Sequence, residues 1–281
     1  MRRLIVNADD FGLHEAVNRG IYEAHTRGIV TSASLMAGGA AFEDAVRIAR
    51  SCPELGVGIH LTLVGGHPVL PPQEVSTLVD EQGNFCASYP VFLSRYLTGR
   101  VRLAEVEQEL AAQIEKMRLA GVTPTHIDSH QHLHVLPGIG GLVLTLARRF
   151  SIRAIRIPAE PVGFLGGMSP APGRLGGRIG LTLLANLFRQ HSLAAGLSVT
   201  QHFFGMLAGG RMNEALLQRI IQSLPEGDSE IMVHPGADSR VLASEYSWGY
   251  HWEEELQALV SPRIRDMLKT KAVQPISFRE L

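Results

Sequence analysis

Short apolar runs alternate with amphipathic segments along most of this chain, and this rhythm limits the folds it can adopt. The apolar runs lie at residues 4–6, 33–36, 57–61, 125–129, 154–157 and 230–233, and each has the length of one buried strand. Helical patterns separate them, at residues 15–26, 42–50, 103–117, 140–149, 181–189 and 214–223. Alternating strands and helices predict a parallel sheet whose crossovers are helices.

Polar residues follow the predicted strands at one end only. They are Asp9 and Asp10, His60, Asp128 and His130, and His234. The first strand has no glycine-rich dinucleotide fingerprint after it, which disfavours a Rossmann fold. Functional residues at the carboxyl ends of parallel strands are typical of (β/α) barrels. We therefore predict an α/β fold with a distorted (β/α) TIM-like barrel.

Two stretches interrupt the alternation of strands and helices. Residues 65–89 are rich in Pro, Gly and Gln and are expected to form a long loop. Residues 158–210 hold many Gly and Pro residues around one apolar helical pattern, and are expected to form a long insert. No second domain is indicated, so residues 1–281 are predicted to be a single barrel domain with this insert.

Composition excludes several classes of protein. A net charge of −1 and a pI near 6.9 do not suit a general nucleic-acid binder. The apolar run at residues 4–6 is too short for a signal peptide, and no run is long enough to span a membrane. Cys52 and Cys86 form no metal or disulfide pattern, and we interpret them as reduced thiols of a cytoplasmic protein.

The segment Asn-Ala-Asp-Asp-Phe-Gly at residues 7–12 places two carboxylates side by side at a strand end. Adjacent carboxylates repel each other unless a cation relieves the repulsion or the two take different roles. One of them could bind a metal while the other acts as a base. The alternative is that Asp9 or Asp10 only caps the following helix.

Residues 126–134 read His-Ile-Asp-Ser-His-Gln-His-Leu-His. In an extended chain alternate residues point the same way, which would put four histidines and Asp128 on one face. Imidazole groups are suitable ligands for zinc and several other divalent ions. Not all of these histidines can bind one ion, so others would orient ligands or bind substrate. The alternative is a solvated polar strand edge.

Three further residues have a suggestive context. His60 lies within the apolar run of residues 57–61, where it is either a metal ligand or a hydrogen-bonded core histidine. His234 precedes Pro-Gly at a strand end and could be a general acid or a turn residue without a role. Arg156 is a charge within a strand pattern, which could pair with an active-site carboxylate or lie at the surface.

The four motifs, at residues 7–12, 58–61, 126–134 and 233–236, together resemble the YdjC-like carbohydrate deacetylases in order and spacing. This resemblance covers about residues 3–280. It implies a distorted barrel with one divalent metal, magnesium or zinc, bound by Asp10, His60 and His130. It also implies Asp9 as the base, His234 as a second catalytic residue and Arg156 as a further one. His132 and His134 are then expected to contact substrate.

Gly196-Leu197 and Phe203-Phe204-Gly205 look like the branch of this family associated with hopanoid biosynthesis. That branch would imply a glycolipid substrate such as an N-acetylglucosaminyl hopanoid. Apolar residues of the insert could hold the lipid, or could pack an extra helix against the barrel. A peripheral membrane contact and a homodimer are left open.

The resemblance implies hydrolysis of the acetamide of an N-acetylated amino sugar. Two other functions use the same residues. One is a metal-dependent esterase or phosphoesterase, because a polar metal site does not define its substrate. The other is a non-catalytic metal-binding or sugar-binding barrel, against which the spare carboxylate of the Asp9–Asp10 pair argues.

Overall fold

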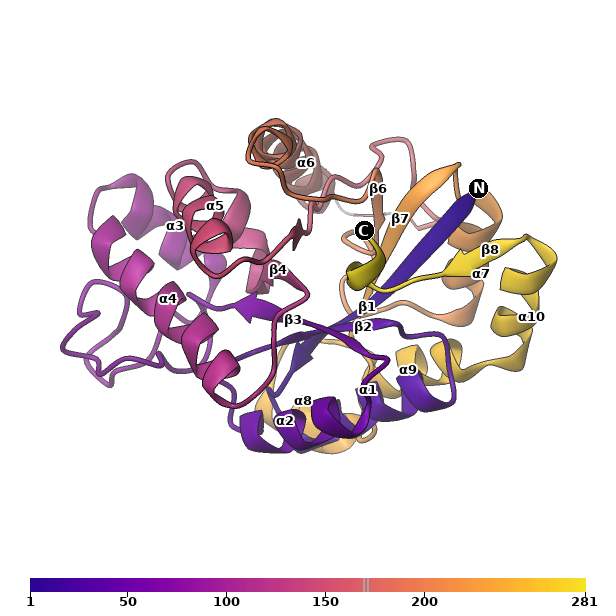
Figure 1. Ribbon diagram of the computed structural model, residues 1–281, viewed down its shortest axis with the longest axis horizontal. Coiled ribbons are helices and arrows are strands. Elements are labelled where there is room, and N and C mark those ends of the chain that lie inside the picture. Colours follow the sequence, from indigo (N-terminus) through magenta and orange to yellow (C-terminus); the bar gives the residue numbers. More distant parts are fainter. Residues whose placement is uncertain (169, 171) are drawn as a thin grey trace.

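The computed structural model describes residues 1–168, 170 and 172–281, and in these residues eight parallel strands form one curled sheet (Figure 1). The strands are β1 (Arg2–Phe11), β2 (Ser32–Leu35), β3 (Gly56–Leu61), β4 (His126–Ser129), β5 (Ala154–Ile155), β6 (His202–Phe204), β7 (Gly227–Val233) and β8 (Val273–Pro275). Their order is β5-β4-β3-β2-β1-β7-β6, and β8 pairs with β1. The parallel sheet predicted from the sequence is confirmed.

The two outer strands of this order, β5 and β6, are linked by the segment that leads into β6. The Ser198 backbone N–H donates to the Arg153 carbonyl at 2.8 Å, and the Ile155 N–H donates to the Ser198 carbonyl at 3.0 Å. This link brings the edges of the sheet together without a regular ladder. The predicted distorted barrel is therefore confirmed, and the distortion lies between β5 and β6.

Helices cover the outside of the sheet. They are α1 (Glu15–Thr26), α2 (Phe42–Ser51), α3 (Tyr89–Leu97), α4 (Leu103–Leu119), α5 (Ile139–Arg149), α6 (Pro172–Ala194), α7 (Glu214–Ser223), α8 (Ser239–Glu245), α9 (Trp252–Val260) and α10 (Pro262–Thr270), with short 3₁₀ turns η1 (His130–Val135) and η2 (Phe278–Glu280). The observed bounds of α1 and α7 are the same as those predicted from the sequence, residues 15–26 and 214–223. Among the described residues, no helix combines the length and apolar character needed to cross a membrane.

The segment expected to be an insert, residues 158–210, contains both α6 and the strand β6. Its last part therefore belongs to the barrel. Helix α6 is much longer than the predicted residues 181–189, because its first turns contain Gly173, Gly176, Gly177 and Gly180, which the sequence pattern does not read as helix. The loop expected at residues 65–89 has no helix or regular strand up to α3.

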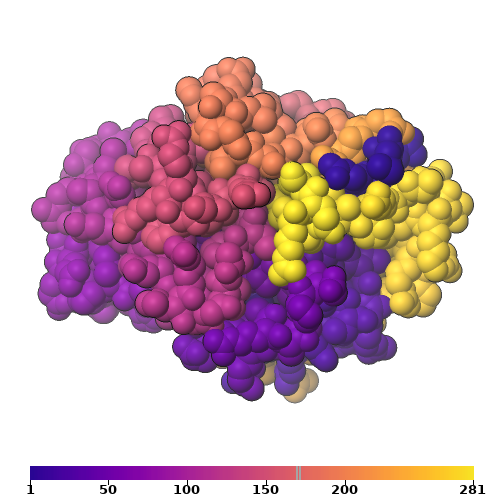
Figure 2. Space-filling view, in the orientation of Figure 1, coloured from indigo at the N-terminus to yellow at the C-terminus, as the bar shows by residue number. Residues whose placement is uncertain are grey.

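Alternate side chains of β1 point to opposite sides of the sheet, toward the surrounding helices or into the barrel. Leu4, Val6 and Ala8 belong to the large core that packs against the helices. Ile5 instead joins a small cluster with Ala154, Ile276 and Phe278, which fills the amino-terminal end of the barrel. Figure 2 shows the yellow carboxyl terminus packed beside the indigo amino terminus. The polar residues Asn7 and Asp9 come next along the strand.

Helix α1 approaches the end of β7 at one glycine. A Cβ atom at Gly20 would lie 2.5 Å from the Cα atom of Gly236, which is backbone and cannot move aside easily. The backbone N–H of Ala237 also donates to the carbonyl of Ala16 at 2.9 Å. The turn after His234 is therefore held directly against α1.

We expect Gly20→Ala to lower the free energy of unfolding by ~1–3 kcal/mol, because the added methyl group overpacks this contact. Gly141→Ala in α5 is the matched control, since a Cβ atom there meets nothing within 4 Å. The better helix propensity of alanine should raise the stability of that variant by up to ~1 kcal/mol. Urea unfolding measures both, and equal stabilisation of the two variants would contradict the packing described.

Candidate metal centre and active site

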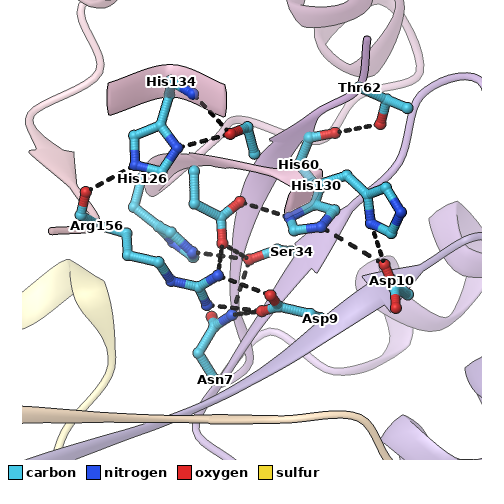
Figure 3. Close-up of polar contacts among 12 residues, drawn as sticks. Asn7, Asp9, Asp10, Ser34, His60, Thr62, His126, His130, His134 and Arg156 are labelled. Atoms are coloured by element: carbon cyan, nitrogen blue, oxygen red, sulfur yellow. Dashed lines mark hydrogen bonds and ion pairs between the residues drawn. The ribbon is translucent and has the colours of Figure 1, made fainter. Parts of the chain in front are cut away.

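The polar residues singled out in the sequence come together at the carboxyl ends of the strands (Figure 3). Asp9 and Asp10 lie near the end of β1, and His60 lies near the end of β3. His130 opens η1 directly after β4, and His234 directly follows β7. In a parallel barrel these ends share one face, which explains why residues far apart in sequence meet here.

A bulge in β1 lets two consecutive carboxylates serve the same site. Successive residues of a regular strand point to opposite faces. Here the register with β2 shifts between Ala8 and Phe11, and Asp10 has a positive φ of 64°. Such backbone strain in a non-glycine residue is often found at functional sites. Both Asp9 and Asp10 are buried in the site as a result.

Asp10, His60 and His130 form a group suited to a metal ion. One ligand atom from each lies within 4.8 Å of the others, and all three side chains are buried. The Asp10 Oδ1 atom lies 3.0 Å from His130 Nδ1 and 3.5 Å from His60 Nε2. One carboxylate and two imidazoles are a donor set suited to divalent ions and leave other positions open. The three residues predicted as ligands are thus brought together.

A second group, Asp9, His60 and Asp128, also has ligand atoms within 4.8 Å of one another. Arg156 already forms ion pairs with both of its carboxylates. The group around Asp10 lacks such a cation partner among the described residues. Asp10, His60 and His130 are therefore the better candidate.

The electrostatics of the group favour a cation. Burial alone lowers the pKa of His60, but the carboxylates of Asp128 and Asp9 outweigh it and raise the pKa to about 10. Burial raises the pKa of Asp10, yet His130, His60 and His234 hold it well below the usual range. The raised pKa of His60 shows that the carboxylates around it leave an excess of negative charge. The residues therefore fit a bound divalent cation.

Asp128 orients His60 from behind. Its Oδ1 atom lies 2.8 Å from His60 Nδ1, which turns His60 Nε2 toward Asp10. Ser34 donates to the other Asp128 oxygen at 2.7 Å. A carboxylate behind a ligating histidine fixes its tautomer and strengthens its binding of metal. His60 and Asp128 are at equivalent positions of the paired strands β3 and β4, a register that only the folded sheet reveals.

Arg156 lies fully buried between three carboxylates. Its Nη1 and Nη2 atoms donate to Asp9 at 2.7 and 2.6 Å, and its Nε donates to Glu230 at 2.7 Å. Nη1 also lies 2.7 Å from Asp128. Burial alone lowers the pKa of Arg156, but Asp128, Asp9 and Glu230 outweigh it and raise the pKa well above the usual value. The expectation that Arg156 pairs with an active-site carboxylate is consistent with this geometry.

The histidine run does not form one face, because β4 ends at Ser129. Gln131 and His132 adopt left-handed conformations with φ values of 56° and 59°, so the following residues turn away. His126 lies deeper in the barrel, where it stacks on Phe278 with ring centres 3.8 Å apart. Burial lowers its pKa to about 3, so it is a neutral core residue. The expectation of a shared face is wrong.

The two histidines expected to contact substrate also lie inside. His134 Nδ1 lies 2.6 Å from the Ser129 hydroxyl, and its Nε2 lies 3.0 Å from the Arg156 carbonyl. Both ring nitrogens are thus engaged, and the geometry gives no support to direct substrate binding by His134. It supports the backbone of Arg156 instead. His132 is buried, and its Nδ1 atom has no hydrogen-bond partner among the described residues.

His234 lies under a segment of alternating aromatic residues. Its backbone N–H donates to Glu255 at 2.5 Å, and its ring packs on Tyr250 with centres 4.8 Å apart. Trp248, from the same segment, packs on His130 at 5.5 Å. The alternation of Tyr246, Trp248, Tyr250 and Trp252 in the sequence could have indicated this cover. His234 therefore lies close to the candidate metal ligands, beneath an aromatic cover and beside the Glu255 carboxylate.

The chain as a whole is similar to proteins of one family. Residues 3–270 match the family described as YdjC-like protein. The chain is 36% identical over 280 residues to a carbohydrate deacetylase of Geobacillus stearothermophilus, covering 99% of this chain and 98% of that protein. It is 33% identical over 299 residues to a carbohydrate deacetylase of Mus musculus, with 99% and 94% covered.

One solved structure is similar over the whole chain. It is a protein of Enterococcus faecalis V583 described provisionally as a cellobiose-phosphate cleavage protein. It superimposes with a TM-score of 0.80 at 27% identity, and the match covers 99% of this chain and 98% of that one.

We expect Asp10→Ala and His60→Ala to abolish stoichiometric zinc binding, because each removes one of three ligands. Asp128→Asn should keep the site and weaken zinc affinity by ~10–100-fold through the loss of His60 orientation. His191→Ala, on the exposed face of α6, is the control. Calorimetry after chelation measures the affinities. Equal zinc binding by His60→Ala and His191→Ala would place the metal elsewhere.

Glu230 gives a pH dependence to stability. Burial raises its pKa to about 7, although Arg156 opposes the shift. A carboxyl group whose pKa is raised in the folded state stabilises the fold at low pH and loses that contribution as the pH rises through 7. We expect chelator-treated Glu230→Gln to match the wild type near pH 5 and to exceed its stability near pH 8 by up to ~3 kcal/mol. Urea unfolding at both pH values tests this, and a difference independent of pH would refute it.

Proposed function

Because the chain belongs to the YdjC-like family, we propose that it is a hydrolase that removes the acetyl group from an N-acetylated amino sugar. The relatives at 31–36% identity named carbohydrate deacetylase support this reaction. The main support from the structure is that Asp9 and Asp10 have different partners. Asp10 faces two histidines, while Asp9 is held by Arg156 beside them.

A divalent cation bound by Asp10, His60 and His130, zinc or magnesium, would polarise the acetamide carbonyl and acidify a water molecule. Asp9 accepts the proton of the attacking water. Arg156 does not touch the reacting atoms in this scheme and is a positioning residue, because its two hydrogen bonds fix both Asp9 oxygens. Asn7 adds a third hydrogen bond to Asp9 at 2.8 Å.

His234 supplies the proton that the leaving group needs. An amine is a poor leaving group unless it is protonated, so a general acid must lie on the side of the nitrogen. His234 directly follows β7, which pairs in the sheet with β1, the strand that carries Asp9 and Asp10. Bond cleavage then yields acetate and the free amino sugar.

The substrate proposed in finer detail is a glycolipid, such as an N-acetylglucosaminyl hopanoid. A cavity of about 1190 Å³ lies between α3 and α6, and eight leucines line it, including Leu93, Leu184 and Leu187. Gln131, next to His130, and Tyr250, which packs on His234, also line it. An apolar aglycone would fit there while its sugar lies at the site. The cytoplasmic location and the homodimer remain predictions.

The test is acetate release from N-acetylglucosamine and from a glycolipid carrying it, after chelation and after addition of Zn²⁺ or Mg²⁺. We expect metal-dependent release, with faster turnover of the glycolipid. Asp9→Asn should retain the metal and lose ~10²-fold or more in turnover, because the base is removed while the ligands stay. Acetyl esters and phosphate esters are the comparison substrates.

Release from esters but not from acetamides would favour the esterase or phosphoesterase alternative. Tight metal binding with no hydrolysis of any of these substrates would favour a binding module. Full turnover by Asp9→Asn would show that another group is the base.

A further inference from the structure

A second cavity, of about 460 Å³, lies beside the apolar one and is lined by three arginines. Arg174 comes from α6, Arg219 from α7, and Arg211 from the segment just before α7. Arg174 and Leu207 line both cavities, so the two adjoin. Neither the metal centre nor the proposed reaction uses these arginines.

Backbone carbonyls, rather than carboxylates, hold the three guanidinium groups. Arg174 donates to the Ala208 carbonyl at 3.2 Å, and Arg211 to the Gly249 carbonyl at 3.3 Å. Arg219 donates to the Gly166 carbonyl at 3.3 Å. Among the described residues, no carboxylate lies within ion-pair distance of any of the three. Their positive charges are therefore oriented but not neutralised.

The backbone around the cavity makes room for these groups. Gly167 and Gly209 both have positive φ values, 78° and 47°. A Cβ atom at Gly167 would lie 1.6 Å from Arg219 Nη1, and one at Gly209 would lie 2.4 Å from Arg174 Nη2. Any larger residue would displace the arginine. The backbone of the cavity wall thus lies close against Arg219 and Arg174, while all three arginines remain exposed to solvent and accessible to a ligand.

The remaining charged residues of the cavity do not cancel the three arginines. Glu254 is its one carboxylate among the described lining residues, and His251 Nδ1 lies 2.7 Å from Glu254 Oε2. The cavity therefore has an excess of positive charge and several N–H donors. Planar guanidinium groups that line one cavity suit an anion with several oxygens, above all a phosphate.

We propose that Arg174, Arg211 and Arg219 form a phosphate-binding site next to the apolar cavity. The phosphate would belong either to a phosphorylated sugar substrate or to the headgroup of an anionic phospholipid whose chains enter the apolar cavity. Both sources present the same oxygens to the same arginines. This binding goes beyond the deacetylation proposed above and does not require it.

The first experiment is calorimetric titration of the purified protein with inorganic phosphate. We expect the double variant Arg211→Gln/Arg219→Gln to bind it at least ~10-fold more weakly than the wild type, because charge-assisted hydrogen bonds are lost. Arg148→Gln, which removes an exposed positive charge at the end of α5, should bind as the wild type does. Phosphate bound by a metal at Asp10 would be lost in neither variant. Circular dichroism checks that both fold.

Two further arms identify the source. Binding to phosphatidylcholine vesicles that contain phosphatidylglycerol, but not to pure phosphatidylcholine, and its loss in the double variant, would assign a lipid headgroup. Tighter binding of phosphorylated than of unphosphorylated N-acetylglucosamine, lost in the same variant, would assign a substrate phosphate. The proposal is overturned if the wild type binds no phosphate, or if the double variant and Arg148→Gln bind it equally. Acetate release plays no part in this readout, so failure here leaves the proposed reaction untouched.

Discussion

The buried guanidinium of Arg156 holds the interior of this barrel together. It bonds to Asp9 on β1, Asp128 on β4 and Glu230 on β7, which lie around the circumference of the sheet. Three buried carboxylates would repel one another without it, and the loss of one partner from a buried ion pair typically costs ~3–5 kcal/mol. The interaction that stabilises the interior is thus the same one that fixes the candidate base.

One positive charge cannot balance all the carboxylates that gather here. After Arg156, the remaining negative charge of Asp128 and Asp9 acts on His60, whose pKa rises to about 10. Burial raises the pKa of Glu230 to about 7, and Asp128 and Asp9 add to this effect. The bulge at Asp10 directs one carboxylate toward the histidines and leaves the other with Arg156. A divalent cation bound by Asp10 and the two histidines would neutralise the remaining negative charge. Asp10 is then a metal ligand, and Asp9 remains available as the base.

The strands and their polar ends could be predicted because both follow from local rules. Apolar periodicity identified β1, β3, β4 and β7, and parallel strands bring Asp10, His60 and His130 to one face. The divergence of the histidine run could not be predicted, since it depends on a left-handed backbone at Gln131 and His132, which residues other than glycine rarely adopt. The roles of Asp128 and Glu230 were missed because they appear only across strand pairs. The first turns of α6 were not predicted, because their glycines are unfavourable in helices.

The aromatic segment between α8 and α9 connects the active site to the outer cavities. Tyr250 packs on His234, while the neighbouring Gly249 carbonyl holds Arg211. The segment is anchored on both sides, because the His251 N–H donates to the Gly210 carbonyl at 2.7 Å and the Gly236 N–H donates to the Trp252 carbonyl at 3.2 Å. Tyr250 lines the apolar cavity and His251 lines the arginine cavity. One anchored segment therefore borders the candidate general acid and both cavities.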